Sequence, residues 1–144
     1  EVGKSGGGPA VNSFAHRSVY LPIVRNYVPE FLQVFDFAEP ASVIGRRDIT
    51  TVSTQALYLL NDQFVINQSR AAATRLLKDE RFADRQERIT GAYLLALGRS
   101  PSGAELAQAS RYLERASGDG QASQEALGAL IQALFASAEF RYAL

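Results

Sequence analysis

The sequence predicts an all-α protein, an antiparallel helical bundle of about five helices behind an extended, loop-rich N-terminal segment. Three observations lead to this fold class. Apolar residues recur at spacings of three and four over most of the chain beyond residue 55. Helix-capping residues separate the periodic runs, and the connections between them are short. The 144 residues are 47% hydrophobic, which is enough for the core of one domain.

The N-terminal segment carries little helical signal. Residues 1–13 contain four Gly, one Pro and two Ser, a composition that favours a flexible arm. Residues 17–25 are β-branched and aromatic, but Pro22 lacks the donor that a central strand needs, so we expect an edge strand or extended chain. A single helical domain over residues 14–144 is expected to follow the arm.

A short helix and a long irregular segment come next. Pro29 and Glu30 match the start of a helix of about two turns. From residue 36 to 53 the pattern lapses, with Pro40 and Gly45 as breakers. Long internal loops in compact domains often carry function.

Two long periodic runs follow this loop. The first covers residues 56–78, and Asp62 is expected to divide it by capping a second helix. The next covers residues 84–97 and ends at Gly98, which suits a left-handed helix end. The charges between residues 78 and 88 alternate in sign, which indicates a solvated helix entry.

The last two helices are marked by a cap and by apolar spacing. Ser102 and Glu105 have the spacing of a capping box and predict a helix start. The final helix is expected over roughly residues 123–138, where leucines repeat at helical spacing.

The amino-acid composition excludes several kinds of partner and site. The 15 basic and 15 acidic residues balance, which argues against nucleic acid as a partner. The chain has no Cys, which excludes disulfides, thiolate metal sites and covalent haem attachment within it. His16 is the one His and is expected at a surface or packing position. No apolar run approaches the ~20 residues of a membrane span. The sequence predicts no cofactor and no metal site.

A polar segment in the loop and the following helix is the candidate ligand site. Arg46 and Arg47 each present a forked set of N–H donors that suits an anion. The neutral side chains of Thr51 and Gln55 could add hydrogen bonds to a sugar. The alternative is structural: an Arg pairs with Asp36 or an Asp of the loop, a hydroxyl caps the following helix, and the Asn breaks it. The candidate residues are Arg46, Arg47, Asp48, Thr51, Gln55 and Asn61.

Catalytic residues are not predicted. The run Thr50–Thr54 offers hydroxyls, but no base stands beside them. Pairs of carboxylates for glycoside hydrolysis could be sought around the loop, yet their sequence spacing does not define a separation.

Several short motifs follow one another in an order that resembles a known domain family. They are Arg17-Ser-Val-Tyr20, Phe35-Asp36, Gly45-Arg46-Arg47, Gln55-Ala-Leu57, Leu59-Leu-Asn61, Leu97-Gly-Arg99 with Pro101 and Glu105, and Glu139-Phe140. The chain resembles a planctomycete-specific domain of unknown function at the C-terminal end of large secreted planctomycete and verrucomicrobial proteins that often carry cytochrome-c-type domains. Ser53 and Gln63 stand where that family often has Pro.

The resemblance implies a secreted or cell-envelope (periplasmic) setting and a multidomain parent protein, but no reaction. Three hypotheses follow. The first is a non-catalytic interaction or scaffold module that packs its Arg-rich loop, with Arg46 and Arg47, against other domains of the same parent. The second is a carbohydrate-binding or carbohydrate-active domain with a polysaccharide partner. The third is a docking domain for a cytochrome-c-type partner.

Overall fold

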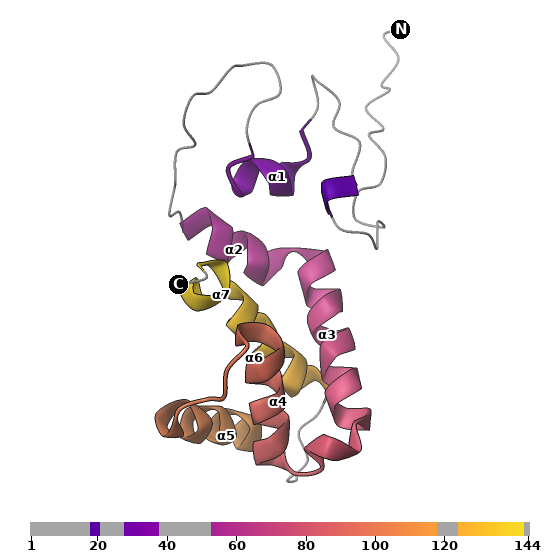
Figure 1. The fold of residues 1–144 in the computed structure, drawn as a ribbon, viewed down its shortest axis with the longest axis vertical. Helices are drawn as coiled ribbons and strands as arrows, with labels where there is room; N and C mark the ends of the chain where they lie inside the picture. Colours follow the sequence, from indigo (N-terminus) through magenta and orange to yellow (C-terminus); the bar gives the residue numbers. More distant parts are fainter. Residues whose placement is uncertain (1–17, 21–27, 38–52, 118–123, 143–144) are drawn as a thin grey trace, which may run out of the picture. The chain divides into compact units, whose positions relative to one another are not determined.

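The structure is a computed structural model. It describes residues 18–20, 28–37, 53–117 and 124–142. Every regular element in these ranges is helical and none is a strand, so the all-α prediction is confirmed (Figure 1). The chain divides into two compact units, Glu1–Gln55 and Ala56–Leu144, which are described one at a time. The single domain over residues 14–144, with an arm at 1–13, stays a prediction.

Two short helical elements lie within residues 18–20 and 28–37 of the first unit. Residues Ser18–Tyr20 form a 3-10 turn, η2, so the prediction of an extended segment is wrong for these three residues. Helix α1 spans Glu30–Val34, as predicted, and Pro29 stands one position earlier than expected, at the N-cap. The proline ring fixes φ in the range that a helix entry needs, and its carbonyl accepts the first turn's N–H groups. Asp36 ends this turn with a left-handed φ of 55°.

The periodic run predicted over residues 56–78 forms two helices. These are α2, Ser53–Asn61, and α3, Gln63–Lys78. Asp62 separates them, as predicted. Its extended backbone stops α2, and its carboxylate accepts the N–H groups of Phe64 at 3.0 Å and Val65 at 3.2 Å. This side chain therefore satisfies two donors that a helix start leaves without partners.

Helix α4, Arg85–Leu97, begins and ends where its sequence signals predict. Asp84 and Glu87 form a capping box, in which each side chain accepts the other residue's backbone N–H. Gly98 closes the helix at φ 69°, a conformation that costs glycine little. A 3-10 turn, η3 (Glu80–Phe82), joins α3 to α4.

Three helices complete the second unit. Helix α5 spans Gly103–Ser117 and starts with the predicted Ser102–Glu105 box, and α6 spans Gln124–Ala136. The final helix was expected to run to about residue 138. Instead Ser137 ends α6 and caps a further short helix, α7 (Ala138–Arg141).

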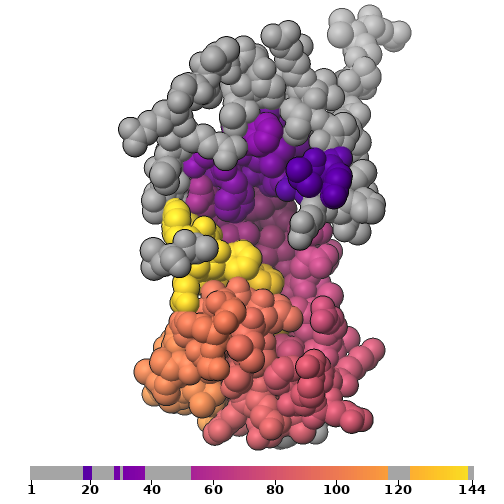
Figure 2. All heavy atoms as spheres, in the orientation of Figure 1, coloured from indigo at the N-terminus to yellow at the C-terminus, as the bar shows by residue number. Residues whose placement is uncertain are grey.

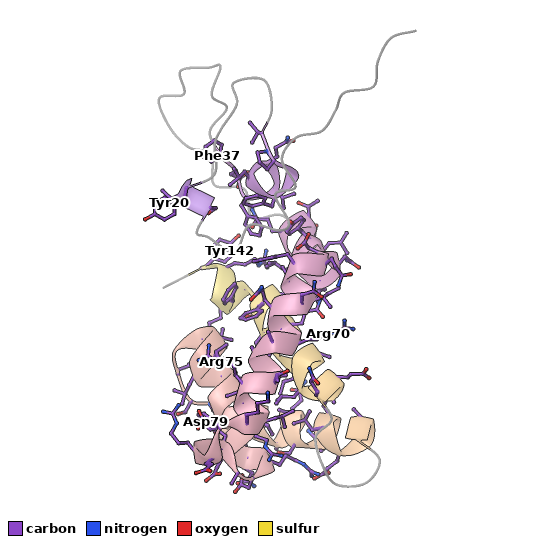
Figure 3. All side chains as sticks on the ribbon, turned by 90° about the vertical axis from the view of Figure 1, so that its right-hand side faces the viewer. Tyr20, Phe37, Arg70, Arg75, Asp79 and Tyr142 are labelled. Carbon is purple, nitrogen blue, oxygen red and sulfur yellow. The ribbon has the colours of Figure 1, made fainter. Side chains whose placement is uncertain are left out.

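The core of the second unit forms where α3, α4, α5 and α6 meet. The most extensive helix pair is α3 with α6, and α5 runs crosswise to α3 in both ribbon views (Figures 1 and 3). The apolar stripes predicted for these helices supply its largest fully buried side chains. These are Ile89, Leu113, Leu127 and Ile131.

Within the ranges that the structure describes, no helix is both long enough and apolar enough to cross a membrane.

Candidate functional site

Two residues of the predicted ligand site lie in the described part of the chain. Gln55 is only 5% exposed, and its Nε2 donates to the Val34 carbonyl at 3.1 Å and to Asp36 Oδ2 at 3.4 Å. It therefore joins the end of α1 to the first turn of α2. Asn61 donates to the Leu57 carbonyl one turn earlier in its own helix, at 2.7 Å.

The other four candidate residues, Arg46, Arg47, Asp48 and Thr51, lie outside the described residues. The anion or sugar site that they would form with Gln55 and Asn61 stays a prediction.

A charged cluster in the second unit brings together residues from three helix ends. Arg99 follows the left-handed Gly98, and its guanidinium donates to Glu105 at 2.8 and 2.9 Å and to Glu139 at 2.5 and 2.7 Å. It also lies over the Tyr93 ring, 5.7 Å from the centroid. Each carboxylate thus receives two donors from one planar cation.

These contacts favour the charged forms of Arg99, Glu105 and Glu139. Hydrogen bonds from Arg99 and from Ser102 lower the pKa of Glu105 to about 2. The Arg99 hydrogen bond also lowers the pKa of Glu139, and the two carboxylates raise the pKa of Arg99. The pKa of Tyr93 is raised, first by desolvation and then by the charge of Glu105.

The Arg99 cluster fastens the end of α4, the start of α5 and helix α7 to one another. Its three members occur in the motifs that carry the family resemblance, Leu97-Gly-Arg99 with Glu105 and Glu139-Phe140. The Arg99 guanidinium is hydrogen-bonded to both carboxylates, so the arrangement suits structural locking better than ligand binding.

Charged and apolar side chains line a groove among the described residues of the second unit. It lies between α3, η3 and α4 and has a volume of about 540 Å³. The turn that joins α3 to α4 lies at the lower edge of this unit in the space-filling view (Figure 2). The groove is lined by Arg75, Leu76, Lys78, Asp79, Arg81, Phe82, Gly91, Leu94 and Leu95.

The groove has a cationic rim. Figure 3 shows Arg75 and Asp79 on one side of α3 and Arg70 on the other. Asp79 is engaged by Arg81, whose Nη2 lies 2.7 Å from Oδ2 and whose Nε lies 3.0 Å from Oδ1. These bonds, with the Arg81 backbone N–H, lower the pKa of Asp79 to about 2.

Arg75 and Lys78 remain on this rim as exposed cations. Arg75 contributes a longer-range attraction to Asp79. Among the described residues neither side chain forms an ion pair or a hydrogen bond. Three positive and one negative side chain line the groove, so its net charge is +2.

The floor of the groove is apolar. Leu94 and Leu95, both on α4, are 46% and 41% exposed. Gly91 lies one turn before Leu95 and lets Phe82 pack against α4, since a Cβ there would stand 3.0 Å from the Phe82 ring. The sequence did not predict this groove, because the alternating charges between residues 78 and 88 indicate a solvated helix entry.

A smaller pocket of about 220 Å³ lies between α3 and α6, beside Arg70, Gly128 and Gln132. Gln132 Nε2 donates to the Leu60 carbonyl at 2.8 Å, which ties α6 to the end of α2.

Within the described ranges, no group of three or more His, Cys, Asp or Glu side chains is placed to hold a metal ion.

Comparison with known proteins identifies a family. The model of a family described as PSD1, protein of unknown function (DUF1553), matches residues 8–113. This agrees with the resemblance to a domain of unknown function that the sequence motifs indicate. No curated protein and no solved structure matches the chain.

Proposed function

The chain belongs to the PSD1 family of proteins of unknown function (DUF1553), and we propose that it is a non-catalytic interaction module that docks another domain of its parent protein. The observation that carries this proposal is the α3–η3–α4 groove, in which two exposed leucines lie beside exposed cations. Many protein-binding surfaces have an apolar centre surrounded by a polar or charged rim.

Covering the groove would yield a useful amount of binding energy. Full burial of a leucine side chain is worth about 2 kcal/mol, and Leu94 and Leu95 are each a little less than half exposed. Covering both therefore contributes about 2 kcal/mol before the polar contacts of the rim are counted. The polar contacts of the rim add to this apolar contribution.

The groove is also built on helices that the core holds in place. Leu76 on α3 and Ile89 on α4 are buried, and the two helices pack on α6. Little conformational entropy is lost when a preformed surface is covered.

The biological setting is part of the proposal. The motif resemblance supports a secreted or cell-envelope protein of planctomycetes and related bacteria, with cytochrome-c-type domains elsewhere in the polypeptide. In that setting the module would hold a neighbouring domain in position and carry out no chemistry of its own.

Carbohydrate binding draws less support from the described residues. Gln55 and Asn61, the two predicted ligands that are described, already donate to backbone carbonyls. A sugar would have to compete with those bonds.

Calorimetry tests the proposal. The remaining part of the parent polypeptide is produced separately and titrated into the 144-residue chain. We expect measurable association that Leu94→Ser/Leu95→Ser weakens about tenfold or more, because about 2 kcal/mol of apolar burial is lost.

Tyr112→Ser is the matched control, since Tyr112 on α5 is 41% exposed but does not line the groove. It should leave the affinity unchanged. Equal weakening by both variants, or no association, would refute the groove as the docking surface.

A further inference from the structure

We propose that the groove between α3, η3 and α4 takes an acidic amphipathic helix of a protein partner. In this complex the partner's carboxylates pair with Arg75 and Lys78, and its apolar side chains cover Leu94 and Leu95. The inference rests on the proposed docking function and names the chemistry of what is docked.

Charge complementarity selects an acidic partner. Arg81 is committed to Asp79 through two hydrogen bonds and lies over the Phe82 ring at 5.6 Å. The carboxylate of Asp79 is thereby matched within the protein. Arg75 and Lys78 have no such counterion among the described residues, so the charge left for a partner is positive.

The spacing of the cations favours a helical partner. Arg75 and Lys78 stand three residues apart on α3, so their stems leave the same face about one turn apart. Carboxylates three or four residues apart on a facing helix have the same separation. The groove itself runs beside two helices, the setting in which an amphipathic helix buries its apolar face.

The lining favours a protein over a glycan. None of the nine residues that line the groove is Asn, Gln, Ser, Thr or Tyr. Sugar hydroxyls are recognised by such neutral hydrogen-bonding groups. The leucines of the groove instead favour contact with apolar side chains of a partner. A sulfated glycan would engage the cations but would leave Leu94 and Leu95 exposed.

Fluorescence anisotropy with the full 144-residue chain tests this inference. The probe is a labelled helical peptide with Leu on one face and Glu along its border. Its matched control peptide has Gln at every Glu position. We expect the Glu peptide to bind about tenfold more tightly, since two surface ion pairs are gained. Raising the salt from about 0.05 M to 0.5 M should remove most of that difference.

Substitutions then locate the contact. Arg75→Gln/Lys78→Gln should weaken the Glu peptide about tenfold and leave the Gln peptide unaffected. The control is Arg111→Gln/Arg115→Gln on α5, which removes the same charge from exposed positions outside the groove. Circular dichroism checks that each variant keeps its helix content.

Three outcomes would overturn the inference. One is equal affinity for the Glu and Gln peptides, and another is equal weakening by the two double variants. The third is binding of sulfated dextran that Arg75→Gln/Lys78→Gln abolishes, without peptide binding, which would assign the rim to a glycan. If the calorimetric test with Leu94→Ser/Leu95→Ser succeeds while the Glu peptide fails, the docking function stands and only the partner chemistry is wrong.

Discussion

Two buried helical glycines should respond in opposite ways to the same substitution. Gly91 on α4 and Gly128 on α6 both lie inside helices, where Ala is favoured over Gly by about 1 kcal/mol. A Cβ on Gly128 would meet the Arg70 backbone at 3.6 Å, an ordinary van der Waals contact. We therefore expect Gly128→Ala to raise the free energy of unfolding by about 1 kcal/mol.

The surroundings of Gly91 leave no such room. A Cβ there would stand 2.9 Å from Leu76 Cδ2 and 3.0 Å from the Phe82 ring. Leu76 is buried in the core and has little space to withdraw. Overpacking typically costs about 1–3 kcal/mol, which cancels or exceeds the gain in helix propensity. Gly91→Ala should therefore be neutral or destabilising by up to about 2 kcal/mol.

Urea unfolding of the two variants and the wild type, followed by circular dichroism, measures the difference. We expect Gly128→Ala to be the more stable variant by at least about 1 kcal/mol. A Gly91→Ala variant as stable as Gly128→Ala would show that Phe82 and Leu76 are not packed against α4, and the floor of the groove would then be wrongly described.

Three further predictions concern single contacts. Arg99→Gln should lower the melting temperature at pH 7. The difference in melting temperature from the wild type should shrink as the pH falls from about 4.5 toward 2. Glu105 and Glu139 have lowered pKa values in the folded state, so their stabilising charges are lost on protonation in that window. A difference in melting temperature that stays constant with pH would contradict this. Asp62→Ala should cost about 1 kcal/mol in urea unfolding, since two N–H groups of α3 lose their acceptor. Ile131→Ala should cost about 3 kcal/mol in the same assay, because this fully buried side chain leaves a cavity in the core.

Local signals allowed most helix boundaries to be predicted. Asp62, Gly98 and the Ser102–Glu105 pair act on backbone groups within a few residues, so their effect can be read from neighbouring sequence. Ser137 was missed because apolar residues continue at helical spacing across it. Its hydroxyl accepts the Phe140 N–H, and this local bond overrides the periodicity.

The arrangement of the charged groups could not be predicted in the same way. Arg99 and Glu139 are 40 residues apart, and only the fold brings α7 beside the end of α4. The groove depends on Gly91 allowing Phe82 to approach α4, a tertiary contact that apolar periodicity does not encode. The charges around it therefore resembled an ordinary solvated surface in the sequence.

An amide chemical-shift map of the labelled chain, titrated with the partner domain that the proposed function requires, tests the docking surface most directly. We predict that the largest shifts fall on residues 75–82 and 91–95, which surround the groove. Shifts concentrated on α5 or α6, with these two segments unchanged, would contradict the assignment of the groove as the docking surface.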